Sequence, residues 1–451
     1  MQMKRKLPFF NHRISPRPSS ARGNASITNL PPNVFTVAAI TLFTLSILKG
    51  LRLPNLWAVT QLTYNYSRGF VRRGLVGELI RLAGGGSPYR YNLLAAVCFV
   101  FFAGASVAVA VLLKRTARKS GDSLEYRLSV LVFASSPGVV FLVHIIGYLD
   151  FILLAGTAAF LTVVLSGPPK RRYACFYLAA ATAVLLTLVH ESFLVLLFPA
   201  MVFGLICRMV RWTDDHPFSI REQIGFVVHL SLTIFICMLS TWFTSKWGTL
   251  NPEDINALIA SISKSSTFPI PTSPFVALSR QPDNNLFSLM PPVLATPRYQ
   301  SLLKIGLLMI LPGFAVLLYQ GITLSLRIHT SAFRRWGLMT AFIGASLAPI
   351  LMNLVGWDAP RWYAFAVVSS FFCISSMQMA FSSDEKEARI RPLTANRLEL
   401  LVILATIAIP LGVLGDNRLF DGAMTQLYPF EKLFEFVHTW VQNDFSYIPT
   451  Q

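Results

Sequence analysis

Residues 92–113 read NLLAAVCFVFFAGASVAVAVLL, an uncharged run of almost entirely apolar side chains. A helix of about 20 such residues is long enough to cross the hydrocarbon core of a bilayer, which is roughly 30 Å thick. Comparable runs recur from end to end in a chain with 54% hydrophobic and only 13% charged residues. Soluble domains carry about 25% charged residues. The sequence therefore predicts an all-α integral membrane protein.

Eleven apolar runs are predicted to span the membrane. Two pairs of runs are nearly continuous, and each pair is either a tight hairpin or a broken helix. The hairpin is favoured because one helix of about 35 residues would overshoot the bilayer core. The predicted spans cover residues 34–51, 92–113, 128–146, 149–166, 174–189, 192–207, 225–243, 303–323, 337–355, 363–382 and 399–415.

The distribution of lysine and arginine predicts the orientation, because cytoplasmic loops of membrane proteins are enriched in these residues. With the N-terminus placed inside, the inner segments hold 24 of the 39 lysines and arginines. Seven of the 15 outer ones lie between Lys49 and Arg90, and the remaining chain divides 24 to 8. The N-terminus is therefore expected in the cytoplasm and the C-terminal tail outside. The net charge of +18 is explained by these loops, so nucleic acid is not an expected partner.

Three regions outside the spans have a distinct composition. Residues 1–33 are basic and rich in Ser, Pro and Asn, which predicts a disordered cytoplasmic tail. Eight prolines in residues 244–302 predict irregular structure. The outer tail 416–451 contains an amphipathic run at 429–437 that is expected to lie along the interface. The transmembrane bundle is expected at 34–415, with outer loops at 52–91 and 244–302.

The segment 66–81 reads YSRGFVRRGLVGELIR and is the strongest exception to the charge distribution. Drawn as one helix, it places Arg68 and Arg72 on the same side as leucines, which a simple surface helix would avoid. The planar guanidinium group donates two hydrogen bonds at once and so suits phosphate. We therefore expect Arg68, Arg72 and Arg73 to hold a phosphate or diphosphate. The alternative is an interfacial helix that binds anionic lipid headgroups.

Three further ionisable residues interrupt apolar runs, namely Asp150, His190 and Glu191. A charge embedded in such a run is unfavourable and by default indicates a functional position. His190 and Glu191 would supply a proton acceptor and the group that orients it. Alternatively, Asp150 caps the following helix, and Glu191 lies near a helix N-terminus where its charge is favoured.

Residues 356–363 read GWDAPRWY and combine a carboxylate, a guanidinium group and three aromatic rings. Tryptophan and tyrosine suit the faces of sugars, and they also suit the membrane interface. The alternative for the two charged residues of this segment is that they simply pair with one another. The expected substrate-binding residues here are Trp357, Asp358, Arg361 and Trp362.

Several chemistries are disfavoured by what the sequence lacks. It has no phosphate-binding Gly-Lys-Ser/Thr loop, no dinucleotide fingerprint and no cytoplasmic segment large enough to bind a nucleotide sugar. No spacing of cysteine or histidine resembles a zinc site, so no metal site is expected. The five cysteines all fall within apolar runs: Cys98, Cys175, Cys207, Cys237 and Cys373.

A polytopic bundle with a cytoplasmic N-terminus and a long first outer loop resembles the lipid-phosphosugar-dependent glycosyltransferases of the GT-C type. The segment RGFVRRGL at 68–75 also resembles uncharacterised bacterial membrane proteins associated with surface polysaccharide. The resemblance implies interfacial helices and a catalytic carboxylate in the first outer loop, where Glu78 is the sole acidic residue. If Glu78 pairs with Arg81 or Arg73 instead, Asp150 or Glu191 becomes the better base. The resemblance implies no nucleotide cofactor and leaves a divalent cation open.

The expected function is that of a membrane glycosyltransferase or polysaccharide polymerase. It would act on polyprenyl-linked sugars at the outer, periplasmic face of a bacterial inner membrane. Its partners would be the lipid bilayer, a polyprenyl-linked sugar or glycan, and polysaccharide-assembly proteins. The alternatives are a flippase or transporter for an anionic or lipid-linked substrate, and an inactive structural member of an export assembly. Charges clustered at one face favour chemistry, whereas charges spread through the membrane depth favour transport.

Overall fold

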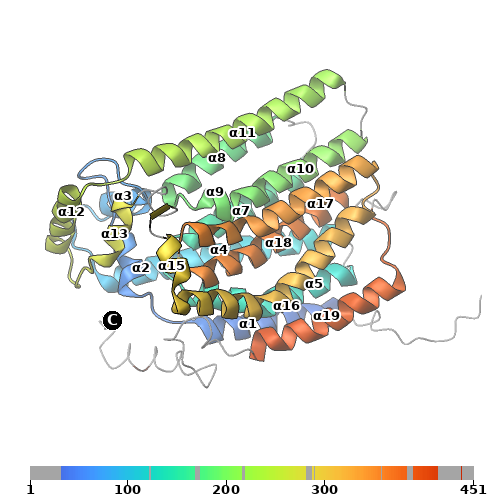
Figure 1. Cartoon of the computed structure of the whole chain (residues 1–451), viewed down its shortest axis with the longest axis horizontal. Helices are drawn as coiled ribbons and strands as arrows, with labels where there is room; N and C mark the ends of the chain where they lie inside the picture. The colour runs from blue at the N-terminus through green and yellow to red at the C-terminus, as the bar shows by residue number, and fades with distance from the viewer. Residues whose placement is uncertain are drawn as a thin grey trace, which may run out of the picture.

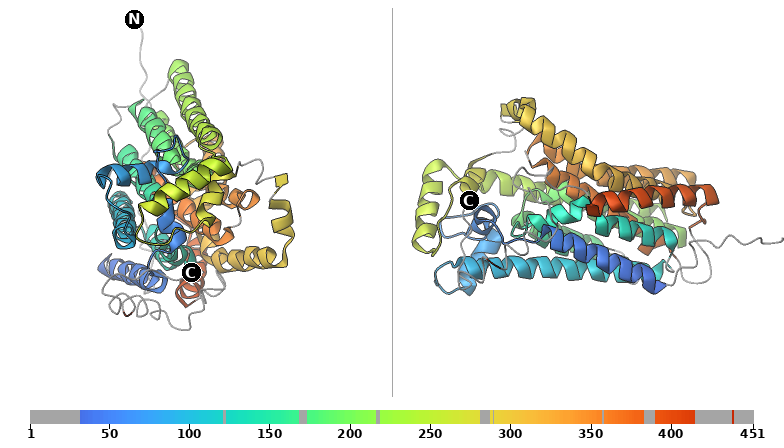
Figure 2. Two further views of the ribbon diagram at one scale, coloured as in Figure 1. Left: turned by 90° about the vertical axis from the view of Figure 1, so that its left-hand side faces the viewer. Right: turned by 90° about the horizontal axis from the view of Figure 1, so that it is seen from below.

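The computed structural model is all-helical, with no β-strand among the residues that it describes. Long helices lie side by side along the long axis of the molecule, and several short helices gather at one end (Figure 1). Figure 2 shows the same arrangement from two further directions. The described residues are 32–120, 123–167, 173–215, 219–280, 287–288, 290–356, 358–382, 390–414 and 438.

The elements fall into three groups by length and position. The longest are α1 (Pro32–Gly50), α4 (Tyr91–Lys119), α11 (Ile220–Trp247), α16 (Pro297–Arg327), α17 (Ala332–Leu347) with its 3-10 continuation η3 (Ala348–Leu354), α18 (Ala359–Phe381) and α19 (Ala395–Leu414). Shorter bundle helices are α5 (Leu124–Ser135), α6 (Pro137–His144), α7 (Asp150–Ser166), α8 (Ala174–Val189), α9 (Phe193–Leu196) and α10 (Phe198–Asp215). The end helices are α2 (Leu56–Gln61), α3 (Gly74–Ala83), α12 (Pro252–Lys264), α13 (Ser273–Ser279) and α15 (Met290–Ala295).

The described residues contain seven helices that are long and apolar enough to cross a membrane, or eight if α5 and α6, bent by 42°, form one span. Helices α7 and α8, at 17 and 16 residues, belong to a class of shorter apolar helices. The prediction of a multi-span helical membrane protein is therefore confirmed. The count of eleven spans stays a prediction, although every predicted apolar run falls on a helix or on a pair of successive helices.

The end that carries α2, α3, α12 and α13 is called the loop end below. Arg52, which follows α1, donates to the carbonyl of His144 at the end of α6. Lys119, at the other end of the bundle, donates to the carbonyl of Leu165 near the end of α7. The chain therefore reverses between α6 and α7, as the predicted hairpin requires. Gly147 lies in this turn with φ +106°, a conformation that favours glycine.

Helix α18 is the centre of the bundle, and every one of its residues is buried. It packs against α16, α10, α6 and α17, which cover it on several sides. Helix α18 begins at the loop end, with Asp358 as its N-cap residue and Pro360 in its first turn. Proline suits this place because its missing N–H would have no helical partner there. The fold therefore brings Arg361, one residue later, into the protein interior.

The prediction of irregular structure for residues 244–302 is wrong, because this region contains α12, α13 and α15. Pro252, Pro274 and Pro297 lie in the first turns of helices, where proline is well tolerated. Proline therefore marks helix starts here rather than the absence of helices. The region is joined to the first loop by hydrogen bonds from Tyr89 N to Ser265 O (2.6 Å) and from Thr267 N to Tyr89 O (2.9 Å).

The expectation of one helix across the arginine segment is also wrong. Helix α3 begins only at Gly74, and the residues before it form turns in which Gly69 has φ +110° and Arg73 has φ +62°. The backbone N–H of Arg72 donates to the carbonyl of Gly248, which follows α11. The contact with Gly248 thus holds this segment in a non-helical conformation, which the spacing of its residues does not predict. Arg68 and Arg72 consequently do not share a helical face.

Some expectations from the sequence fall on parts of the chain outside the described residues. They are the disordered tail, apart from its last two residues, the side chain of Trp357, and the amphipathic run at 429–437 in the C-terminal tail.

The close approach of α3 to the first loop gives a test of the fold. A Cβ atom at Gly77 would lie 1.9 Å from the carbonyl oxygen of Tyr64. Gly77→Ala should therefore displace α3 and destabilise the protein by about 1–3 kcal/mol. Gly104→Ala on α4 is the matched control, because a Cβ there meets nothing within 4 Å. Thermal unfolding in detergent checks both variants, and an unchanged midpoint for Gly77→Ala would contradict the packing described.

Candidate functional site

Charged side chains from several separate segments meet inside the loop end. They come from the turn before α3, the first residue of α7, the break between α8 and α9, and the first turn of α18. We call this group the loop-end network and define it as Arg72, Arg73, Asp150, His190, Glu191 and Arg361.

The deepest contact of the network joins Asp150 and Arg361. Nε of Arg361 donates to Oδ2 of Asp150 at 2.7 Å, and Nη2 donates to Oδ1 at 2.5 Å. The Asp150 side chain is fully buried and that of Arg361 is 6% exposed. This two-point geometry is the strongest form of an ion pair between side chains. Asp150 is the first residue of α7, and the N-cap residue of this helix is Leu149. The carboxylate of Asp150 is paired with Arg361, a residue that is distant in the sequence.

Aromatic rings complete the surroundings of Arg361. Its guanidinium carbon lies 5.1 Å from the ring centroid of Tyr148 and 4.9 Å from that of Trp362, within the range of cation–π attraction. Trp362 is buried and donates its indole N–H to the carbonyl of Gly356 at 3.3 Å. Asp358 lies 3.9 Å from Arg361, so the pairing considered within GWDAPRWY exists as a long contact. The shorter pair is the one with Asp150.

A second two-point pair joins the arginine segment to the break after α8. Nε of Arg73 lies 3.1 and 3.0 Å from the two carboxylate oxygens of Glu191, and Nη2 donates to Oε1 at 2.5 Å. Arg73 is also the one non-glycine residue with positive φ among the residues described. Such a conformation is uncommon for a residue with a side chain and clusters at functional sites. The ion pair with Glu191 holds this turn in place.

His190 lies between the two ion pairs. Its Nε2 is 3.5 Å from Nη2 of Arg361, and its Nδ1 is 3.6 Å from Oε2 of Glu191. The backbone N–H of Ser192 donates to Nδ1 at 3.2 Å, and the Ser192 hydroxyl lies 2.8 Å from the same nitrogen. The imidazole is thus oriented by its own turn and connects the Asp150–Arg361 pair to the Arg73–Glu191 pair.

Arg72 is the least compensated charge of the network. It is only 4% exposed, and its nearest carboxylate, that of Glu191, is 4.0 Å away. Its Nε has no hydrogen-bond partner within the described part of the chain. Burial lowers the pKa of Arg72 to about 10; Glu191 opposes this shift, while Arg73 and Arg280 add to it. A buried cation with so little compensation is unfavourable unless an anion binds it.

Two residues predicted for the site lie apart from the network. Glu78 accepts hydrogen bonds from Arg81 Nε (2.9 Å), from Arg81 Nη2 (2.5 Å) and from the backbone N–H of Tyr66 (2.9 Å). The hydrogen bond from Arg81 lowers the pKa of Glu78. Glu78 is therefore paired with Arg81, the case for which the sequence favours Asp150 or Glu191 as the better candidate for the catalytic base. Arg68 is exposed and forms no ion pair within the described residues.

Sequence reasoning missed two residues beside the network. Tyr148 contacts Arg361, and its position two residues before Asp150 was the available signal. Tyr64 is fully buried, and its hydroxyl has no hydrogen-bond partner among the described residues. Burial raises the pKa of Tyr64, while the charges of Arg73 and Arg72 oppose that shift. Nothing in the apolar and polar pattern around Tyr64 distinguishes it from a core tyrosine.

The charged groups of the loop-end network are guanidinium groups and carboxylates. No three His, Cys, Asp or Glu side chains converge as a metal site requires anywhere in the described ranges. All five cysteines are buried as free thiols. The network holds three guanidinium groups against two carboxylates, which leaves an excess of one positive charge. One of the two carboxylates is partly accessible, since the Glu191 side chain is 14% exposed.

Comparison of the chain with models of protein families, with curated proteins and with solved structures finds no match. The fold and the site therefore define the class on their own. The protein is a multi-span helical membrane protein with a buried network of arginines and carboxylates at one end of the bundle.

The Asp150–Arg361 pair gives the sharpest test of the network. Arg361→Met leaves a buried carboxylate without its cation and should destabilise the protein by about 3–5 kcal/mol. The double variant Asp150→Leu/Arg361→Met removes both charges and should recover most of that loss. Unfolding of Arg361→Met, of Asp150→Leu and of the double variant in one detergent measures the coupling.

Arg81→Met is the control for this experiment. It breaks a two-point pair of the same kind, but Arg81 is 41% exposed and the effect should stay within about 1 kcal/mol. A double variant as unstable as the sum of its single variants would show that Asp150 and Arg361 do not interact.

Proposed function

We propose that this protein is a membrane glycosyltransferase that takes a sugar from a polyprenyl-linked phosphosugar. In this proposal it acts at the outer face of a bacterial inner membrane, in the synthesis of cell-surface polysaccharide, by single transfer or by polymerisation. The observation that carries the proposal is Arg72, a buried guanidinium group with incomplete compensation beside Arg73. A bound phosphate or diphosphate supplies the missing negative charge with the geometry that guanidinium groups favour.

The orientation is supported by where the cations lie. The end of the bundle opposite the loop end carries Lys114, Arg115, Arg118 and Lys119 on α4 and Arg334 and Arg335 on α17. These belong to the loops that the lysine and arginine distribution assigns to the cytoplasm. The loop end is then the outer face, and all eleven apolar runs cross the membrane in this proposal.

The chemistry follows from the network. The acceptor hydroxyl gives its proton to Glu191, which is the more exposed of the two network carboxylates and is flanked by His190. The acceptor oxygen forms a bond to the anomeric carbon, and the bond from that carbon to the phosphate oxygen breaks. The electron pair leaves on the phosphate, where Arg72 stabilises the developing charge. Protonation of Glu191 releases Arg73 from their ion pair, so that Arg73 also stabilises this charge. Asp150 is fully buried against Arg361 and serves to hold that residue in place.

Transport is the second candidate, and the depth of the charges argues against it. On α4, α7 and α18 every Asp, Glu, Lys and Arg lies within the first or last few residues of the helix, and α8 contains none. A pathway for a charged substrate would place ionisable groups along the membrane depth. Charges confined to the two ends favour chemistry at one face.

The test is sugar transfer by the purified protein in lipid, with a polyprenyl-diphosphate-linked hexose as donor and a second polyprenyl-linked sugar as acceptor. Glu191→Gln should lower the rate by about 10²–10⁴-fold, as expected for loss of a general base. Arg72→Gln should lower it by about 10²–10³-fold through lost charge stabilisation.

Arg68→Gln is the matched control, because Arg68 is exposed in the same loop and should change the rate little. Transfer by Glu191→Gln at the wild-type rate would refute the assigned base. Movement of labelled lipid across vesicles with no product would favour transport instead.

A further inference from the structure

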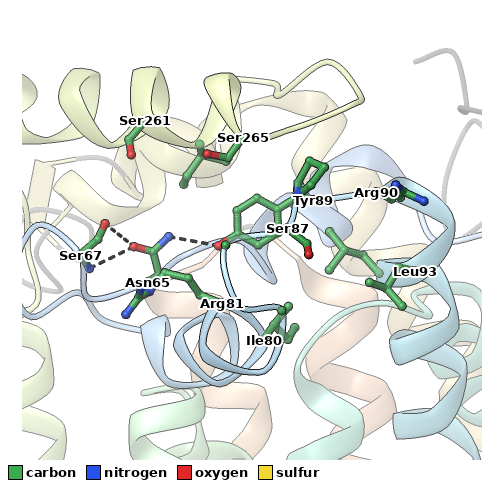
Figure 3. A pocket seen from close by; sticks show the side chains of 15 residues that line it. Asn65, Ser67, Ile80, Arg81, Ser87, Tyr89, Arg90, Leu93, Ser261 and Ser265 are labelled. Atoms are coloured by element: carbon green, nitrogen blue, oxygen red, sulfur yellow. Dashed lines mark hydrogen bonds between the residues drawn. The ribbon is translucent and has the colours of Figure 1, made fainter.

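A pocket of about 280 Å³ lies at the loop end, outside the loop-end network. Its walls come from the first loop and the start of α4 on one side and from α12 on the other, as Figure 3 shows. Helix α3 separates it from the network, with Arg73 just before its first residue and Ile80 and Arg81 of its last turn in the pocket wall. Ten helical residues correspond to about 15 Å, so the two sites are distinct.

The pocket is lined by many small polar groups. Ser87, Ser261 and Ser265 make no side-chain hydrogen bond within the described residues. The hydroxyl of Tyr89 accepts from Nδ2 of Asn65 at 3.3 Å and keeps its own proton to donate. Hydroxyl groups both donate and accept, so this wall matches a ligand that is itself rich in hydroxyls.

Apolar surface completes the walls of the same pocket. Ile80, Leu93, Leu94 and Ile262 line it together with Tyr89. A sugar ring presents hydroxyls at its edge and carbon-bound hydrogens on its faces, so it needs both kinds of contact. The volume lies near the lower limit of roughly 300 Å³ for ligand pockets, which suits a small ligand rather than an extended cofactor.

The polar wall is held in place before any ligand binds. Oδ1 of Asn65 accepts from the backbone N–H of Ser67 at 3.0 Å and from its hydroxyl at 2.5 Å. The backbone of Tyr89 is hydrogen-bonded to Ser265 and Thr267, which joins the first loop to the chain that follows α12. A wall fixed in this way loses little entropy on binding.

The charges distinguish this pocket from a phosphate site. Arg81 lies in the wall, but two of its nitrogens are committed to Glu78. Arg90 is an exposed residue of the wall. Dedicated phosphate sites offer cations or backbone N–H groups without carboxylate partners. Here hydroxyls outnumber cations, and one of the two cations is neutralised.

We infer that this pocket is a carbohydrate-binding site that holds one sugar ring. The inference goes beyond the transferase proposal, because sugar binding here needs no chemistry at the loop-end network. A sugar held about one helix length from the network would be part of a glycan rather than the sugar undergoing transfer.

The test is saturation-transfer NMR on the purified full chain in nanodiscs, with glucose, galactose and N-acetylglucosamine as probes. Ser261→Leu fills the pocket and should abolish the transfer signal or weaken binding at least tenfold. Ser263→Leu is the matched control, because Ser263 lies exposed on the same helix outside the pocket wall and should leave the signal unchanged. Tyr89→Phe removes a single oxygen and should weaken the signal severalfold without altering the unfolding midpoint.

Two outcomes would overturn the inference. One is that none of the three sugars gives a signal, or that Ser261→Leu binds them as the wild type does. The other is that glycerol 1-phosphate, a mimic of an anionic lipid headgroup, gives the only signal. Because the experiment measures binding without turnover, its failure is distinguishable from a failure of the transferase proposal.

Discussion

The two-point ion pair between Asp150 and Arg361 is the interaction on which the loop end depends. It joins the start of α7 to the start of α18, the helix around which the bundle is packed. Two charges withdrawn from water are stable only with near-ideal geometry and further contacts. Tyr148, Trp362 and Asp358 supply those contacts to Arg361. The pair therefore fixes the positions of the first turns of α7 and α18 relative to each other. His190 contacts Arg361 of this pair, and Glu191 lies beside His190.

The turn before α3 is the second constraint, and it depends on the first. Arg73 adopts a left-handed conformation that is unfavourable for a residue with a side chain by about 1–3 kcal/mol. Its ion pair with Glu191 and the bond from Arg72 N to Gly248 O oppose that strain. The result is that Arg72 faces the protein interior with little compensation. We regard this as the feature most suggestive of a ligand, because proteins retain such unfavourable arrangements mainly where function needs them.

Much of the fold could be predicted from the sequence, because a membrane permits few structures. Residues 92–113 predicted a helix because backbone groups in lipid must pair within their own segment. The arginine segment was predicted wrongly, since its conformation depends on Gly248, a tertiary contact that periodicity does not report. Within the site, the sequence offered nearby Asp358 as the alternative partner of Arg361, whereas the main partner of Arg361 is Asp150, 211 residues away. Single residues of the site were therefore predictable, and their pairing was not.

The central claim is that Arg72 and Arg73 bind the phosphate of a polyprenyl-linked substrate rather than lipid headgroups. Its most direct test is equilibrium binding of a short-chain polyprenyl diphosphate to the protein in nanodiscs, with and without phosphatidylglycerol. Loss of a hydrogen bond to a charged group is worth about 1.5–3 kcal/mol, so Arg72→Gln should weaken binding tenfold or more. The account predicts that this loss persists in phosphatidylglycerol-rich nanodiscs. Equal affinities of wild type and Arg72→Gln, or displacement of the diphosphate by phosphatidylglycerol, would contradict it.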